Sequence, residues 1–156
     1  MLDRIQRIIE QYTDKKILIA VAESCTGGYI SHMFTNISGA SNVFERGVVT
    51  YSNKAKEEIL NVESNTIEKY GAVSEIVAQQ MAKNIREISK VDIGIGVTGI
   101  AGPTGGTKEK PVGLVYIGLS TKENTFVKKY IIKENRINFK KKVLELILDC
   151  LENLSI

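Results

Sequence analysis

Three short apolar runs constrain the fold most, because a helical pattern separates each from the next. The runs are ILIAVA, GVVTYS and VDIGIGVTG, at residues 17–22, 47–52 and 91–99. Continuous apolar runs of this length are typical of strands that are covered on both faces. Apolar residues at helical spacing occur before and between them, as in residues 2–12 and 73–89. Strands that alternate with helices predict one α/β domain with a largely parallel sheet.

The last third of the chain has a different pattern. VGLVYIGLS (112–120) and NTFVKKYIIK (124–133) are typical of two adjacent strands, and the turn TKEN between them predicts a hairpin. A final helix is predicted to begin near Arg136 and to take its apolar face from VLELILDCLENL. We therefore expect a mixed, largely parallel sheet of about five strands.

The composition is that of a globular protein. The 156 residues are 43% hydrophobic and 25% charged, with a formal net charge of +3, and this length suits one domain. Lysines are interleaved with acidic or apolar residues, which favours solvated helix faces over a nucleic-acid-binding stripe. No apolar run approaches the roughly 18 residues of a membrane span. We expect a soluble, cytoplasmic protein with no nucleic-acid or membrane partner.

Two motifs resemble nucleotide-binding loops but lack the required context. Gly94, Gly96 and Gly99 spell G-x-G-x-x-G, yet the first two lie inside a predicted strand rather than in a strand-to-helix turn. The segment GPTGGTK lacks the Gly-Lys-Ser/Thr ending of a P-loop. The two cysteines, Cys25 and Cys150, have neither zinc-binding spacing nor a disulfide framework. We expect no cofactor and no metal.

The segment AESCTGG (22–28) places three candidate nucleophiles, Ser24, Cys25 and Thr26, between a buried strand and a predicted helix. Ligands of α/β folds bind at the carboxyl ends of strands, and N–H groups at a helix start attract anions. On spacing alone, a helix-capping turn fits this segment equally well. The single histidine, His32, lies about two turns into the next helix, which makes a Ser-His-Asp triad improbable and favours a surface or packing role.

A lysine can replace histidine as a base if burial lowers the pKa of its ammonium group. The segment TYSNKAK (50–56) places Tyr51, Lys54 and Lys56 just after a predicted strand. Because the lysines are two residues apart, at most one of them is expected to reach the site. Without further information, either lysine is also compatible with a solvated surface charge.

The loop TGIAGPTGG (98–106) follows another predicted strand. Its glycines, which include Gly99 and Gly102, leave a surface that a ligand can approach closely, and successive N–H groups there can form an anion-binding nest. A long irregular loop at a strand end is often functional. We expect this loop to contact a ligand.

Four segments in this order resemble the CinA C-terminal domain (PncC) family, whose members are nicotinamide-nucleotide amidases (NMN deamidases). The segments are AESCTGG, FERGVVTYSNKAK, YGAVSE and GIAGPTGGTKEKPVG, and with the flanking helices the resemblance covers essentially the whole chain. It implies a single amidase domain over residues 1–156, a three-layer α/β/α sandwich and a homodimer. It also implies hydrolysis of the carboxamide of NMN to nicotinic acid mononucleotide and ammonia, without a metal.

The resemblance assigns roles by motif position. Ser24 becomes the nucleophile, Lys56 the base and Tyr51 an assisting group, which leaves Lys54 at the surface. Thr98 matches a position beside the substrate.

Arg136 matches a family arginine, although KEN precedes it here in place of F-x-G-D, and its fork suits a 5′-phosphate. Backbone N–H groups of Thr26, Gly27 and Gly28, or of the 99–106 loop, are expected to hold the oxyanion.

Three alternatives stay open. Cys25 is the rival nucleophile to Ser24, although no histidine is placed to activate it. A Ser–Lys amidohydrolase that acts on another amide would use the same residues. A non-catalytic nucleotide-binding or competence-associated interaction protein would not need them.

Overall fold

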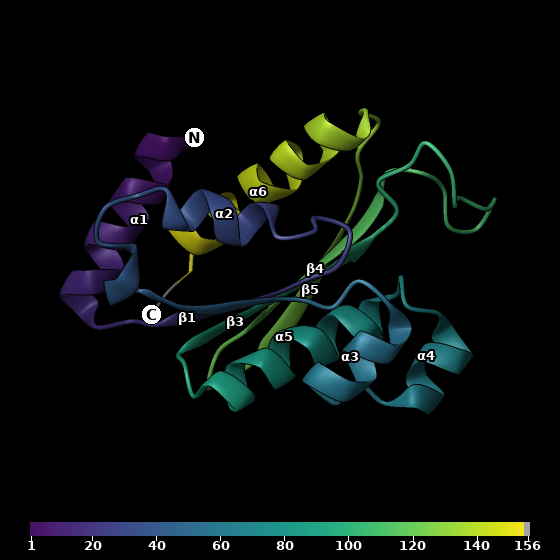
Figure 1. Cartoon of the computed structure of the whole chain (residues 1–156), viewed down its shortest axis with the longest axis horizontal. Helices are drawn as coiled ribbons and strands as arrows, with labels where there is room; N and C mark the ends of the chain where they lie inside the picture. The colour runs from purple at the N-terminus through teal and green to yellow at the C-terminus, as the bar shows by residue number, and fades with distance from the viewer. Residues whose placement is uncertain (155–156) are drawn as a thin grey trace.

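A five-stranded sheet in the order β2–β1–β3–β4–β5 separates two layers of helices in the computed structural model, which describes residues 1–154 (Figure 1). The strands are β1 (Ile19–Glu23), β2 (Phe44–Val49), β3 (Ile93–Gly99), β4 (Leu114–Ser120) and β5 (Thr125–Ile131). The helices are α1 (Leu2–Lys15), α2 (Tyr29–Thr35), α3 (Asn53–Leu60), α4 (Ser64–Tyr70), α5 (Glu75–Ser89) and α6 (Arg136–Glu152), with a 3₁₀ turn, η1 (Ala40–Asn42). Residues 155 and 156 of the predicted domain lie outside the described residues.

The mixed sheet combines a parallel half with an antiparallel half. Strand β1 pairs in parallel with both β2 and β3, and Glu23 stands opposite Val49 on one side and Val97 on the other. Strands β3, β4 and β5 are antiparallel neighbours, so the predicted hairpin is confirmed. The predicted α/β/α fold with a mixed five-stranded sheet is also confirmed. The three parallel strands end at the same edge of the sheet.

The two faces of the sheet carry side chains of different sizes. Helices α1, α2 and α6 cover one face, where Ile and Val side chains of β1 and β3 point into the larger apolar core (Figure 1). Helices α3, α4 and α5 cover the other face, where β1 presents Ala20 and Ala22. Because side chains alternate along a strand, large and small residues are sorted onto opposite faces.

Glycines let α5 lie directly against the sheet. A Cβ atom added to Gly94 would be 2.1 Å from the Ala82 carbonyl oxygen, and one added to Gly96 would be 2.5 Å from the Ala82 nitrogen. Gly118 of β4 likewise faces the α5 backbone. The first two glycines of the G-x-G-x-x-G motif therefore serve helix–strand packing, and the prediction that they lie inside a strand is confirmed.

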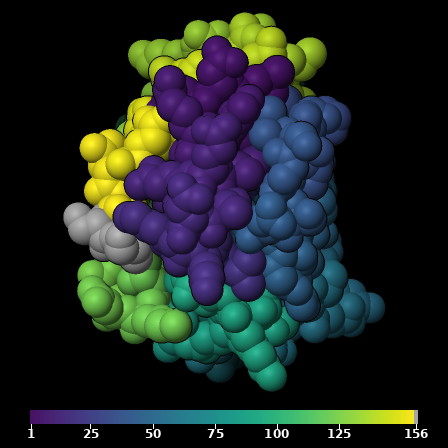
Figure 2. Space-filling view, turned by 90° about the vertical axis from the view of Figure 1, so that its left-hand side faces the viewer, coloured from purple at the N-terminus to yellow at the C-terminus, as the bar shows by residue number. Residues whose placement is uncertain are grey.

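Hydrogen bonds connect helices α1 and α6 at the end of the molecule opposite the carboxyl ends of the parallel strands. Figure 2 shows α1 lying across this face between α6 and the segment after α2. The Arg4 guanidinium donates to Asp149 and Glu152, each at 2.6 Å, and the buried Tyr12 hydroxyl donates to the Leu151 carbonyl at 3.0 Å. Within residues 1–154, no helix has the length and apolarity needed to cross a membrane.

Candidate active site

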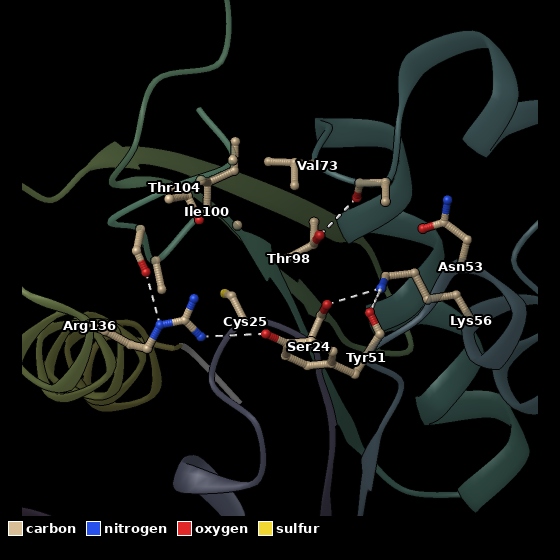
Figure 3. Close-up of a pocket in the computed structure, with 15 residues that line it drawn as sticks. Ser24, Cys25, Tyr51, Asn53, Lys56, Val73, Thr98, Ile100, Thr104 and Arg136 are labelled. Atoms are coloured by element: carbon tan, nitrogen blue, oxygen red, sulfur yellow. Dashed lines mark hydrogen bonds between the residues drawn. The ribbon is translucent and has the colours of Figure 1, made fainter. Parts of the chain in front are cut away.

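The ends of the three parallel strands bring together residues that are far apart in the sequence (Figure 3). Ser24 directly follows β1, and its N–H donates to the Val97 carbonyl of β3 at 3.1 Å. Thr50 directly follows β2, and its N–H donates to the Glu23 carbonyl at 2.8 Å. Both bonds continue the sheet ladder beyond the strands, so the backbone at the site is held by the sheet itself.

Lys56 lies on the first turns of α3 and points back toward this edge. The Ser52 hydroxyl accepts a hydrogen bond from the Ala55 N–H at 3.0 Å, which caps α3 and fixes its start. The Lys56 Nζ atom then donates to Ser24 Oγ at 3.0 Å and to the Thr50 carbonyl at 2.8 Å. A serine hydroxyl and an amine are thus placed within direct proton-transfer distance.

The environment of Lys56 favours its neutral form. The side chain is only 1% exposed, and its acceptors are a hydroxyl and two carbonyls, none of which is charged. Burial lowers the pKa of Lys56 from its usual 10.5 to about 8. About a tenth of this amine is therefore neutral at pH 7 and free to accept a proton, far more than for an unperturbed lysine.

The other candidates for base and nucleophile lie in unsuitable environments. Lys54 is exposed and is 3.5 Å from Glu58, which confirms its predicted surface position. His32 of α2 is exposed and is hydrogen-bonded to Asn36, the residue that follows this helix, as predicted for a surface role. Cys25 lines the same pocket as Ser24, but burial raises the pKa of its thiol to about 12. The reactive thiolate is consequently scarce at neutral pH.

Arg136 closes the opposite side of the pocket (Figure 3). It is the first residue of α6, whose N-cap Asn135 accepts from two backbone N–H groups. Its Nε donates to the Gly102 carbonyl at 2.9 Å, and its Nη1 is 3.5 Å from the Tyr51 hydroxyl. The guanidinium therefore connects the glycine-rich loop to the segment that follows β2.

The pocket between these groups encloses about 250 Å³. Its lining includes all three predicted catalytic residues and four of the predicted substrate contacts: Ser24, Tyr51, Lys56, Thr98, Gly99, Gly102 and Arg136. The Thr98 hydroxyl donates to the Ala72 carbonyl at 2.8 Å and so ties β3 to the segment before α5. Seven residues that are distributed along the sequence thus form one site.

The turn after Ser24 lies behind this lining. Thr26, Gly27 and Gly28 are outside the pocket wall, and the N–H groups of Gly27 and Gly28 already donate to the Ser24 carbonyl and to Glu23. The Thr26 hydroxyl is buried and has no hydrogen-bond partner among the described residues. The structure thus places these three residues where they shape the turn, apart from the pocket surface.

The sequence interpretation missed several residues of the site. Four further residues line the pocket: Asn53, Val73, Ile100 and Thr104. The only sequence signal for them was that they lie close to the motifs. Glu23 lies in the AESCTGG segment, but no role was predicted for it. Its position was a usable signal: a carboxylate at the end of an otherwise apolar strand is expected to be buried, and a buried charge requires hydrogen-bond partners.

Among the described residues 1–154, no three His, Cys, Asp or Glu side chains lie close enough together to hold a metal ion.

Comparisons with known proteins identify relatives of this chain. A family model described as the CinA C-terminal domain matches residues 3–155. A competence-damage inducible protein of Thermoanaerobacter pseudethanolicus is 54% identical over 129 residues, which are 83% of this chain and 31% of that protein. One from Acetivibrio thermocellus is 55% identical over 123 residues, 79% of this chain and 30% of that protein. The chain thus spans about a third of the length of these relatives.

Solved structures extend the comparison to the fold. The competence/damage inducible protein CihA of Agrobacterium tumefaciens superposes with a TM-score of 0.93 and 37% identity, over 97% of this chain and 93% of that chain. A competence damage-inducible protein A of Klebsiella pneumoniae also reaches 0.93, with 27% identity over 97% and 95% of the two chains.

Proposed function

The chain belongs to the CinA C-terminal domain family, and on that premise we propose that it is a nicotinamide-nucleotide amidase. The reaction converts NMN and water into nicotinic acid mononucleotide and ammonia. The observation that carries the proposal is the 3.0 Å hydrogen bond between the buried Lys56 Nζ and Ser24 Oγ inside the pocket. A serine activated by a neutral lysine suits nucleophilic attack on a carboxamide.

The proposed mechanism has two halves. Ser24 Oγ attacks the carboxamide carbon while Lys56 accepts the hydroxyl proton, and the tetrahedral intermediate collapses when Lys56 returns that proton to the departing ammonia. The resulting ester on Ser24 is then attacked by water, with Lys56 again as the base. Cleavage of the ester returns the proton to Ser24 Oγ and releases the carboxylic acid.

The oxyanion of the intermediate needs donors beside Ser24. The N–H groups of Cys25 and Thr26 donate to no oxygen among the described residues, whereas those of Gly27 and Gly28 are occupied. Since Cys25 lines the pocket, we propose its N–H as the donor from this turn.

Arg136 is proposed to bind the 5′-phosphate. Its Nε is already bonded to Gly102, but the remaining guanidinium N–H groups suit a phosphate, and the side chain is exposed at the pocket wall. Tyr51, whose carbonyl is 3.4 Å from Lys56 Nζ and whose hydroxyl approaches Arg136, is proposed to assist between the two. Such an enzyme would act in pyridine-nucleotide salvage as a cytoplasmic homodimer.

Ammonia release from NMN by the wild type, Ser24→Ala and Cys25→Ala tests the proposal. We expect turnover by the wild type, retention of most activity in Cys25→Ala and a loss on the order of 10⁴-fold or more in Ser24→Ala. Full activity in Ser24→Ala would refute the mechanism. Absence of NMN turnover by the folded wild type would favour another amide as substrate, to be sought with a panel of carboxamides, or a non-catalytic binding protein.

A further inference from the structure

Glu23 is a fully buried carboxylate beside the proposed nucleophile, and it lies outside the pocket lining. Its Oε1 accepts from the Ser31 N–H at 2.8 Å and from the Ser31 hydroxyl at 2.6 Å. Its Oε2 accepts from the Gly28 N–H at 3.0 Å and from the Ile30 N–H at 3.1 Å. Four donors from the start of α2 therefore converge on one side chain, which ties down both ends of the Ser24–Gly28 turn.

The backbone of Glu23 connects the same turn to the base. Its carbonyl accepts the Thr50 N–H at 2.8 Å, and the Thr50 carbonyl in turn accepts from Lys56 Nζ at 2.8 Å. Ser24 is the next residue along the chain. Glu23 is thus linked to both groups: it is covalently bonded to Ser24, and it is connected to Lys56 through hydrogen bonds of Thr50.

We infer that Glu23 is a positioning residue, whose carboxylate holds the turn so that Ser24 Oγ stays within reach of Lys56 and Cys25 stays unreactive. The inference rests on the proposed amidase function for its first half only. A displacement of about 1 Å at a reacting group is sufficient to cost about 100-fold in rate. Exposure of Cys25 is a property of the turn and does not depend on the substrate.

The carboxylate also occupies N–H groups that would otherwise favour a thiolate. Unpaired N–H groups at a helix start stabilise negative charge and lower the pKa of a nearby thiol. Here three such groups donate to Glu23, which adds a negative charge near Cys25. Burial is the main cause of the raised Cys25 thiol pKa, and the Glu23 carboxylate raises it further.

The substitution Glu23→Gln distinguishes a carboxylate from a side chain of the same shape. Each carboxylate oxygen accepts two bonds, whereas a glutamine must direct its NH₂ group at one of these donor pairs. The turn is therefore expected to shift without a change in side-chain volume. Glu10→Gln, which makes the same change on the exposed face of α1, is the matched control.

Two measurements follow for each variant. With NMN, Glu23→Gln should lose about 100-fold in kcat with little change in KM, because the geometry of the reacting groups changes and substrate contacts do not. Alkylation of Cys25 by iodoacetamide, followed on its own peptide by mass spectrometry, should become faster. Glu10→Gln should match the wild type in both. A merely stabilising role for Glu23 would leave kcat per folded molecule unchanged and would contradict the inference.

Ser31→Ala provides a second test that does not depend on the folding of Glu23→Gln. It removes only the 2.6 Å hydroxyl bond to Glu23 and should shift kcat and Cys25 alkylation in the same directions by smaller factors. If Glu23→Gln does not fold and Ser31→Ala leaves both rates at the wild-type value, the inference is wrong. If the wild type does not hydrolyse NMN, the proposed function fails, and the Cys25 alkylation rates alone decide the role of Glu23.

Discussion

The two sides of the pocket are built differently. On one side, Ser24 and Lys56 are buried, and their contacts are hydrogen bonds to each other and to backbone that continues the sheet. On the other side, Tyr51 is 61% exposed and Arg136 projects from the first turn of α6 toward a glycine-rich loop. Rigid placement suits the reacting groups, and adaptable surface side chains suit substrate contact. Changes on the first side should therefore alter rate, and changes on the second should alter affinity and selectivity.

After Ser24→Ala, the largest effect is expected for Lys56→Met, which removes the amine and keeps an apolar chain of similar length. Without the proposed base, hydrolysis of NMN should fall by about 10²–10⁴-fold. Stability is subject to two opposing terms. The folded state no longer holds an amine whose charge is disfavoured by burial, but Ser24 Oγ and the Thr50 carbonyl lose a donor. We therefore expect the free energy of unfolding at pH 7, measured by chemical denaturation, to change by less than about 3 kcal/mol.

Lys54→Met is the control for that change. Lys54 is exposed and forms an ion pair with Glu58 one turn along α3, so both activity and stability should stay near the wild type. Wild-type turnover by Lys56→Met would remove the lysine from the mechanism.

The next largest effect is expected on the exposed side, for Arg136→Leu. Loss of charged hydrogen bonds to the phosphate should raise KM for NMN by about 10–100-fold, with a smaller change in kcat. The preference for NMN over its dephosphorylated riboside should fall by a similar factor, measured as the ratio of kcat/KM values. Arg46→Leu, on the exposed edge strand β2, should keep that preference. An unchanged preference in Arg136→Leu would place the phosphate elsewhere.

The pH dependence should report on the buried side alone. With a Lys56 pKa of about 8, about a tenth of the amine is neutral at pH 7, so kcat/KM should rise about tenfold from pH 7 to its plateau. Between pH 8 and 10.5 the unfolded chain binds more protons at this position than the folded chain. Stability from this group should therefore increase with pH over that range. A plateau reached only above pH 10 would contradict a depressed pKa.

A smaller effect is expected for Tyr51→Phe, because the Tyr51 hydroxyl lies on the exposed side and only its carbonyl contacts the buried side. Its carbonyl and its hydroxyl contact Lys56 and Arg136 respectively, and only the hydroxyl is removed. The loss in kcat/KM should be about two- to tenfold. Tyr70→Phe, which removes another exposed phenol, should have no effect on turnover. A loss as large as that of Lys56→Met would make Tyr51 a principal catalytic group.

The smallest effect on activity is expected for Thr98→Val. The isosteric change removes the hydrogen bond to the Ala72 carbonyl and leaves that oxygen without this donor. Thermal or chemical unfolding should show a loss of about 1–3 kcal/mol, whereas kcat with NMN should change little. A large fall in kcat at unchanged stability would indicate that the Thr98 hydroxyl contacts the substrate directly.

The sequence predicted the fold better than the site. Apolar runs and helical spacing predict elements because their periodicity is local, and the five strands and the hairpin followed from them. The choice between Lys54 and Lys56 was not decided by spacing, since burial of one and exposure of the other depend on how α3 meets the sheet. Only the resemblance to a family favoured Lys56 over Lys54 at the level of the sequence.

Two features of the site could not be predicted from local sequence patterns. Val73 reaches the pocket because Thr98 binds the Ala72 carbonyl, a contact between residues 26 positions apart. The convergence of four donors on Glu23 depends on the turn that follows β1, and a buried glutamate in a sequence does not specify its partners. Side-chain placement of this kind is a property of tertiary structure.

The glycines beneath α5 have a consequence for how this protein can diversify. At Gly94, Gly96 and Gly118, no side chain of the sheet lies between the strands and α5, so packing there cannot be adjusted by small changes in side-chain size. A larger residue at these positions would displace the whole of α5. The segment that precedes α5, with Ala72 and Val73, would move with it and change one pocket wall. We expect that wall to tolerate little change, so a new substrate preference should arise more readily through the glycine-rich loop and the start of α6.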